Sequence, residues 1–317
     1  MAQMDLSICI LTWNQPELLP RCVASCLAEI EREGLAAEII LIDNASCDGS
    51  PQRAANLSPL VRLVRNERIL GFSQANNIAI RMSQGKYVLI LNDDTEFHPG
   101  ALGVLVRAMD GDPHIGAVGP KFLNPDGSLQ RANAPKRLPR LRGMVSEMLN
   151  LDYVLEKFAL TRDLLTNRRD PERSGDAEQI DGACLLARRE ALDAVGLFDE
   201  GFYFLFEDSD LCYRLKKAGW RLWYSPEAQV THYGGASFKK VARSRRSAMF
   251  FEGLIRYFKK HSSPGRFLLF RLTLAAALCL KVPLAVLLSM SPLSEVRQSW
   301  RGTVPTYSKT LRSLLFA

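Results

Sequence analysis

The sequence predicts an α/β fold with a parallel central sheet, followed by a basic helical tail. Over the first hundred residues, short apolar runs alternate with helix-like segments. Each run is continuously apolar, which is typical of strands buried on both faces of a parallel sheet. The 317 residues, 47% of them hydrophobic, are enough for one large domain or two smaller ones.

The elements expected in this first part alternate between strand and helix, in the rhythm of right-handed βαβ units. Pro16 near the start and Gly34 at the end mark the limits of the first helix. In chain order we expect a strand at 6–11, a helix at 15–34, strands at 38–42 and 61–64, a helix at 72–84 and a strand at 87–91.

The second part is less regular. Over 125–179 the pattern blurs, and 131–142 is basic and rich in proline, which is typical of a mobile lid or a partner-contacting insertion. Beyond it we expect helices at 188–195 and 211–218, each stopped by a glycine, and strands at 221–224 and 228–232.

Polar residues follow the predicted strands, as in Asp43-Asn44 and Asn92-Asp93-Asp94. Ligands of open α/β sheets bind beyond the carboxyl ends of the strands. Oxygen ligands there could hold Mg²⁺ or Mn²⁺ against a diphosphate, and a solvated acidic turn is the alternative. The absence of a Gly-x-Gly-x-x-Gly run and of a Walker A loop argues against dinucleotide and P-loop sites.

The charge is unevenly distributed along the chain. Residues 238–317 contain 15 Lys and Arg but only 2 Asp and Glu, so the preceding residues are net acidic although the whole chain carries +7. This argues against nucleic acid as a partner of the main domain. A basic tail rich in leucine and phenylalanine instead predicts contact with an anionic membrane surface.

The apolar stretch 266–290 is long enough to span a bilayer, but Arg271, Lys281 and Pro283 interrupt it. We therefore expect helices on or in the membrane interface, with a buried helical hairpin or a dimer contact as the alternative. Seven scattered cysteines indicate a reducing compartment, and the N-terminus has no basic leader. We expect a cytoplasmic protein, peripheral on the inner face of the plasma membrane, of undetermined oligomeric state.

Short motifs at 7–14, 42–50, 66–77, 91–95, 181–183, 196–214 and 232–235 follow one another at ordinary spacing. Together they resemble the family 2 inverting glycosyltransferases of GT-A fold, most closely their bacterial rhamnosyltransferase-like branch. The resemblance implies a mixed, mainly parallel sheet in a domain at 1–237. Its nucleotide-binding half would span about 1–95 and its acceptor half about 96–237, with a variable insertion at about 125–179. The helical tail at 238–317 lies outside the resemblance.

The resemblance also implies how a nucleotide-sugar donor is held. Asp43 would hydrogen-bond the pyrimidine base, and Asp93 would face the ribose. Thr12 and Trp13 would line the base pocket, although core packing is an alternative for Trp13. The remaining donor-binding residues implied in this way are Asn14, Asn77 and two supports of the turn, Asn44 and Asp48.

The same resemblance implies a metal site and a catalytic base. Asp94 and His232 would be protein ligands of a divalent cation, with Asn92 helping directly or through water. Asp208 would remove the proton from the acceptor hydroxyl, and the adjacent Glu207 would orient the acceptor or the base. The alternatives are a structural histidine and an acidic helix start.

The sequence is thus identified as a member of a family whose activity would be metal-dependent, inverting transfer of a sugar, with rhamnose as the candidate. The acceptor would be a hydroxyl of a saccharide or a lipid-linked saccharide in cell-surface polysaccharide synthesis. One alternative is a non-catalytic membrane-associated scaffold with the same fold. Another is a sugar-phosphate nucleotidyltransferase, although the glycine-rich first loop expected for that chemistry is missing.

Overall fold

The computed structural model describes residues 4–133, 136–141, 143, 170–234, 241–290, 300 and 303–316. The chain forms two compact units. The first comprises Met1–Leu138, Arg168–Tyr203 and Glu207–Ser237, and the second comprises Pro139–Asn167, Phe204–Phe206 and Phe238–Ala317. Most of the insertion expected at about 125–179 lies outside the described residues.

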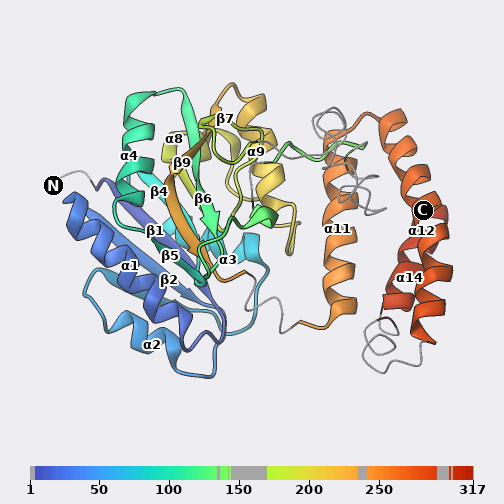
Figure 1. Ribbon diagram of the computed structural model, residues 1–317, viewed down its shortest axis with the longest axis horizontal. Helices are drawn as coiled ribbons and strands as arrows, with labels where there is room; N and C mark the ends of the chain where they lie inside the picture. The colour runs from blue at the N-terminus through green and yellow to red at the C-terminus, as the bar shows by residue number, and fades with distance from the viewer. Residues whose placement is uncertain are drawn as a thin grey trace. The chain divides into compact units, whose positions relative to one another are not determined.

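The first unit contains a mixed nine-stranded sheet, counted over the described residues (Figure 1). The strand order is β3-β2-β1-β4-β8-β6-β9-β5, and β7 pairs with β9. The strands are β1 Leu6–Thr12, β2 Ala37–Asp43, β3 Val61–Arg65, β4 Tyr87–Asn92, β5 Thr95–Phe97, β6 Ile115–Leu123, β7 Gly175–Asp176, β8 Cys184–Arg188 and β9 Arg221–His232.

The four strands predicted in the first hundred residues are confirmed, each within a residue or two of its expected limits. They are parallel, with β1 between β2 and β4. The register pairs Thr12 with Asp43 and Leu11 with Asn92. The polar residues that end these strands therefore lie at one edge of the sheet.

Two helical layers cover the sheet, and alternate side chains of each strand face one layer or the other. In β1, Ile8 and Ile10 pack in the cluster with α1 (Leu18–Glu33) and α4 (Ala101–Gly111). Cys9 packs on the other side with α3 (Phe72–Met82), α8 (Arg189–Val195) and α9 (Glu207–Lys217). Figure 1 shows α1 and α4 on one side of the strands and α9 on the other. A short helix, α2 (Ser50–Ala55), precedes β3.

Two elements differ from the sequence prediction. Helix α9 begins at Glu207, four residues before the expected start, because acidic residues fill its first turn and suit the positive end of a helix. The strands expected at 221–224 and 228–232 are one strand, β9, whose pairing with β6 shifts register between Pro120 and Lys121.

Antiparallel pairing of β5 with β9 joins two distant parts of the chain. It sets Thr95 opposite His232. The backbone N–H of Tyr233 donates to the carbonyl of Asp94 at 2.9 Å. The end of β9 is thereby fixed beside the polar residues that follow β4.

The second unit contains the helices α11 (Arg243–His261), α12 (Pro264–Ser289) and α14 (Thr303–Phe316). Phe258 of α11 stacks on Phe270 of α12 with 4.2 Å between ring centroids. Arg271, one of the charges that interrupt the apolar stretch, donates to the carbonyl oxygen of Leu314. Phe206 also belongs to this unit and packs against Phe250 and Tyr257.

Helix α12 has one apolar face without a covering layer in the described residues. By length and composition it could cross a membrane, and only 28% of its most apolar 18-residue stretch is buried. Leu280 and Leu287 are 69% and 67% exposed. The other large apolar side chains exposed on this helix are Leu268, Leu269, Leu272, Leu284 and Val286.

Candidate active site

The candidate site is built at the carboxyl ends of β1, β2 and β4. Thr12 and Asp43 end their strands, are 1% and 4% exposed, and pair with each other in the register. Asn92 ends β4 and is half-buried, and the buried Asp93 and Asp94 follow it. The structure therefore brings the predicted polar residues of three strands to one edge of the sheet.

Hydrogen bonds join the loops that follow β1 and β2. The backbone N–H of Asn14 donates to Ser46 Oγ at 3.0 Å, and Asn14 Oδ1 accepts from the backbone N–H of Cys47 at 2.9 Å. Asp43 Oδ1 accepts from the backbone N–H of Ser46 at 2.8 Å. Asn14 has φ 51°, a left-handed conformation that asparagine tolerates better than most residues. These contacts hold the two loops as one surface.

Asn44 extends that surface toward the start of α3. Its Oδ1 accepts from the backbone N–H of Leu70 at 2.9 Å and from Asn66 Nδ2 at 3.2 Å. Its Nδ2 donates to the carbonyl of Leu70 at 3.0 Å. The contacts agree with a supporting role for Asn44 beneath a ligand rather than direct recognition.

Asp48 and Asn77 serve neighbouring segments. Asp48 Oδ1 accepts from the backbone N–H and the hydroxyl of Ser50, at 3.0 and 2.7 Å, and so fixes the start of α2. Asn77 is buried, and its amide bonds both backbone groups of Phe198 as well as the carboxylate of Glu200. Because this amide is occupied by the loop before α9, we leave Asn77 out of the donor site.

Trp13 is half-buried and belongs to neither of the two hydrophobic clusters that cover the sheet. Its position directly after Thr12 puts it at the same edge as Asp43.

Asp94 and His232 form a close pair at this edge. His232 Nε2 lies 3.2 Å from Asp94 Oδ1, and both residues are about 95% buried or more. Beyond this ion-pair contact, Nε2 accepts or donates no hydrogen bond within the part of the chain that the structure describes. Burial opposes a charge on His232, but the neighbouring Asp94 more than offsets it and raises the pKa of the ring.

Gln130 determines which nitrogen of His232 carries the proton. Its Nε2 donates to the backbone carbonyl of His232 at 2.7 Å, and a carbonyl can only accept. Gln130 Oε1 therefore faces His232 Nδ1, at 2.7 Å, and Nδ1 must donate to it. In the neutral ring this leaves the lone pair on Nε2, directed to the side of Asp94.

These residues fit a divalent cation. An orphaned imidazole nitrogen beside a carboxylate, with the other nitrogen held by an amide, is the arrangement of a metal-binding histidine. Among the described residues no three of His, Cys, Asp and Glu surround one point. Two protein ligands still suit Mg²⁺ or Mn²⁺, because such ions keep waters and take substrate phosphate oxygens.

Asp208 lies in the first turn of α9 and is held from several sides. Its Oδ2 accepts from the backbone N–H of Gly182 at 3.3 Å and from Gln179 Nε2 at 3.4 Å, and its Oδ1 accepts from the backbone N–H of Ser209 at 2.6 Å. Burial and the neighbouring Asp181 raise the pKa of Asp208, while Lys136 opposes them. The result is an oriented carboxylate with increased affinity for a proton.

Two other acidic residues of α9 have different surroundings. Burial and the adjacent Asp208 raise the pKa of Glu207 well above its usual value, and none of the described residues makes a hydrogen bond to its Oε2. Asp210 is fully buried and pairs with Arg214 at 2.8 Å. Arg214 in turn donates to the carbonyls of the segment before α9, so Asp210 has a structural role.

Gly182 contacts Asp208 through its backbone N–H. A Cβ at this position would meet Asp208 Cβ at 3.5 Å and Phe72 at 3.7 Å, which are ordinary contacts. The packing of the protein alone therefore does not require glycine here. The carbonyl of the next residue, Ala183, accepts from the backbone N–H of Asn92 at 2.9 Å, so this segment contacts both β4 and Asp208.

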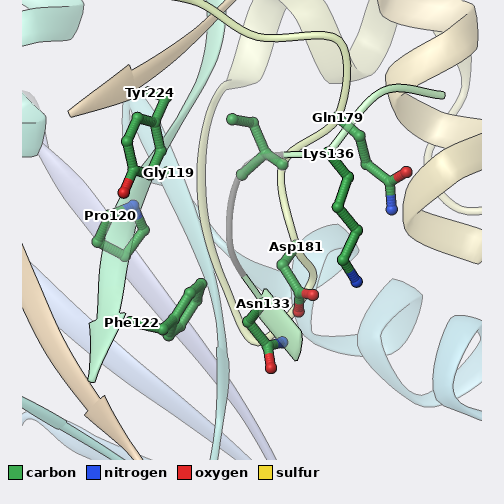
Figure 2. A pocket seen from close by; sticks show the side chains of 9 residues that line it. Gly119, Pro120, Phe122, Asn133, Lys136, Gln179, Asp181 and Tyr224 are labelled. Atoms are coloured by element: carbon green, nitrogen blue, oxygen red, sulfur yellow. The ribbon is translucent and has the colours of Figure 1, made fainter. Parts of the chain in front are cut away.

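A cavity adjoins this segment (Figure 2). Its polar lining comes from Asn133, Lys136, Gln179 and Asp181. The apolar lining includes Pro120, Phe122, Ile180 and the ring of Tyr224. The sequence motif at 181–183 contained Asp181, but the contributions of Gln130, Lys136 and Gln179 carried no local signal.

Comparisons with known proteins identify the family of this chain. The model of the family described as Glycosyl transferase family 2 matches residues 7–195. An N-acetylglucosaminyl-diphospho-decaprenol L-rhamnosyltransferase of Mycobacterium tuberculosis is 33% identical over 297 residues, which are 89% of this chain and 92% of that protein. The O-antigen biosynthesis protein RfbC of Myxococcus xanthus is 29% identical over 73% of this chain and 17% of its own length.

Solved structures share the fold. The crystal structure of GalNAc-T7 with UDP, GalNAc and Mn²⁺ has a TM-score of 0.56 at 21% identity, covering 73% of this chain and 43% of that chain. The mannosyltransferase PcManGT from Pyrobaculum calidifontis, in complex with GDP-Man and Mn²⁺, has a TM-score of 0.54 at 18% identity. The match covers 98% of this chain and 87% of that chain. The expected GT-A fold is confirmed.

The raised pKa of Asp208 predicts a pH-dependent effect of Asp208→Asn on stability. Folding favours the protonated carboxyl, so its contribution to stability is present below the pKa of the unfolded chain and is lost as pH rises through the folded pKa. Asparagine does not titrate. Urea unfolding should therefore show the variant gaining free energy of unfolding relative to wild type from about pH 4 to pH 7, by ~1.4 kcal/mol per unit of raised pKa.

Asp193→Asn is the matched control, because Asp193 is exposed on the neighbouring helix α8. Because its side chain is exposed, its replacement should change the free energy of unfolding only slightly. A constant difference between Asp208→Asn and wild type from pH 4 to pH 7 would contradict the account of this carboxylate.

Proposed function

Because this chain belongs to glycosyl transferase family 2 and is a glycosyltransferase, we propose that it moves a sugar from a nucleotide-sugar donor to a lipid-linked saccharide with inversion at the anomeric carbon. The observation that carries the proposal is the segment 181–183. Its Gly182 N–H contacts Asp208, and its Ala183 carbonyl contacts the end of β4, next to Asp93 and Asp94. The proposed base and the proposed diphosphate site would therefore lie on either side of one short segment.

The donor would lie across the joined loops of β1 and β2. Asp43 and Thr12 would contact the base there, and Trp13 would offer an aromatic face at the same edge. Asp93, directly after β4, would face the ribose. Asn14, Asn44 and Asp48 would act through the loop contacts that they make.

The transfer would proceed by one displacement. The acceptor oxygen bonds to the anomeric carbon as the bond from that carbon to the donor phosphate oxygen breaks. The hydroxyl proton passes to the carboxylate of Asp208, whose raised pKa makes it a stronger base at neutral pH. Gly182 and Ser209 hold that carboxylate through backbone N–H groups. Glu207 would keep the acceptor or the base oriented.

Asp94 and His232 Nε2 would hold a divalent cation, with Asn92 contributing directly or through water. When bound, the ion would neutralise the departing diphosphate as a Lewis acid. Gln130 would keep His232 in the tautomer that leaves Nε2 able to bind metal.

The relative from Mycobacterium tuberculosis supports a narrower proposal for the substrates. Its name describes transfer of L-rhamnose to an N-acetylglucosaminyl-diphospho-decaprenol, and it matches this chain over nearly its whole length. We therefore favour a dTDP-rhamnose donor and a diphosphate-linked lipid acceptor, in cell-surface polysaccharide synthesis. Neither scaffolding nor nucleotidyl transfer is favoured by an observation of its own.

A lipid-linked acceptor requires access to a membrane. The exposed leucines of α12 give this helix an apolar face, and α11 begins and ends with basic residues. Apolar side chains beside Lys and Arg suit the interface of an anionic membrane. We propose that the second unit binds the inner face of the plasma membrane in this way.

Asp208→Asn tests the catalytic proposal. We expect sugar transfer from dTDP-rhamnose to membrane-extracted acceptor to fall by 10²-fold or more, because the acceptor hydroxyl has no base. Nucleotide binding, measured by calorimetry, should be unchanged. Asp193→Asn should retain full activity, and turnover by Asp208→Asn near the wild-type rate would remove Asp208 from this role.

His232→Ala and Gln130→Leu test the metal site. We expect Gln130→Leu to weaken Mn²⁺ binding about 10- to 100-fold, because loss of a partner that orients a ligand has effects of this size. His232→Ala should weaken it at least as much. Mn²⁺ binding would be followed by electron paramagnetic resonance without turnover.

His98→Ala is the control for these two variants. His98 lies just after β5, and its Nε2 pairs with the hydroxyl of Thr231 at 2.9 Å, away from Asp94. Its removal should leave Mn²⁺ binding unchanged. Equal affinity in all three variants and wild type would refute the assignment of His232 and Gln130.

Replacing leucines on the exposed face of α12 tests the membrane proposal. Leu272→Ser combined with Leu280→Ser and Leu287→Ser should reduce flotation with vesicles of phosphatidylglycerol and phosphatidylethanolamine, because apolar surface is lost from the interface. Leu57→Ser with Leu60→Ser is the control, since both leucines are exposed in the first unit. Unchanged flotation of the α12 variant would contradict the proposal.

A further inference from the structure

The cavity that adjoins segment 181–183 is lined by a lysine, Lys136, that the mechanism above does not use. Lys136 is half-buried, and its backbone forms an isolated antiparallel bridge with Gln179. Figure 2 shows the Lys136 side chain extending into the cavity, with its ammonium group on the side of Asp181. The bridge to Gln179 fixes the backbone from which this side chain projects.

Lys136 is close enough to Asp208 to lower its pKa against the effects of burial and of Asp181. No carboxylate of the described residues lies within 4 Å of its ammonium group in an ion pair. A half-buried ammonium that forms no ion pair with a described carboxylate can still bind an anionic ligand. Asn133 and Gln179 line the same cavity and have amide groups that can donate to phosphate oxygens.

The position of the cavity limits which part of a substrate could enter it. The attacking hydroxyl must lie at the carboxylate of Asp208, and Gln179 both contacts that carboxylate and lines the cavity. A group bound in the cavity would then be attached to the acceptor sugar, near the hydroxyl that reacts. The proposed donor site lies at the strand ends, and no residue named for it lines the cavity.

We propose that Lys136, with Asn133 and Gln179, binds the phosphate that is joined directly to the acceptor saccharide. This inference rests on the proposed function and adds the part of the chain that recognises the anionic portion of the acceptor. The ammonium group of Lys136 would also offset the repulsion between that phosphate and the carboxylates of Asp181 and Asp208.

The test compares two acceptors that carry the same saccharide. One is linked through a diphosphate to a short lipid, and the other is linked to an uncharged alkyl chain. Lys136→Met should raise KM for the diphosphate acceptor about 10- to 100-fold, the range expected when a hydrogen bond to a charged group is lost. KM for the uncharged acceptor and for the nucleotide-sugar donor should not change.

Two variants make the comparison specific. Lys136→Arg should recover most of the affinity for the diphosphate acceptor, because it keeps the positive charge. Lys217→Met should behave as wild type, since Lys217 is exposed in the last turn of α9. The pH dependence of the transfer rate distinguishes an effect of Lys136 on Asp208 from an effect on acceptor binding. A changed pKa of Asp208 would shift the acidic limb of this profile equally with both acceptors.

Three results would overturn the inference. Equal losses with both acceptors would mean that Lys136 acts only on Asp208. A raised KM for the donor would assign Lys136 to the donor diphosphate. Equal calorimetric affinity of wild type and Lys136→Met for inorganic pyrophosphate, without divalent cation, would mean that no phosphate binds at Lys136.

The pyrophosphate measurement requires no turnover and separates this inference from the proposed function. Failure of the wild-type protein to transfer sugar to either acceptor would refute the proposed function. Weaker pyrophosphate binding by Lys136→Met in that case would still support an anion site at Lys136.

Discussion

The site depends on the antiparallel pairing of β5 with β9. Three residues of β5 follow Asp94 directly, and their pairing sets Thr95 opposite His232. Asp94 and His232 are well over a hundred residues apart in the sequence, and without this pairing nothing in the local chain would hold them together. The backbone hydrogen bond from Tyr233 to Asp94 continues the ladder by one residue and fixes the two side chains 3.2 Å apart.

A second constraint is the concentration of acidic residues around segment 181–183. The charge of Asp181 raises the pKa of both Asp208 and His232, so this carboxylate acts on both side chains. Such crowding destabilises the empty site, because buried carboxylates repel one another. A metal cation on one side and Lys136 on the other would offset this repulsion. Strain of this kind is typical of sites arranged around a charged ligand.

Much of the fold could be predicted because its signals are local. The apolar runs of β1, β2, β3 and β4 were evident in the sequence, and so were the polar residues that follow them. Those polar residues lie together at one edge of the sheet. The strands β6 and β8 were not predicted, because their pairing is long-range and mixed in direction. The early start of α9 was missed because its first turn, with Glu207 and Asp208, is polar on most sides.

The site was predictable where a side chain belongs to a motif and not where its role depends on a partner. Gln130 and Lys136 lie in or beside the irregular region, and only their contacts with His232 and the cavity reveal them. Asn77 illustrates the converse. Its sequence context implied ligand binding, but its amide is occupied by Phe198 and Glu200. Sequence alone cannot distinguish a buried amide that binds the chain from one that binds a ligand.

The central claim is that a single displacement occurs at a carbon flanked by Asp208 and the diphosphate site. The most direct test is the anomeric configuration of the product, determined by nuclear magnetic resonance after transfer from a donor of known configuration. The account predicts inversion, because one attack from the side of Asp208 expels the diphosphate from the opposite face. Retention of configuration would require two displacements and an enzyme nucleophile, a role that we propose for no residue. That result would contradict a single displacement.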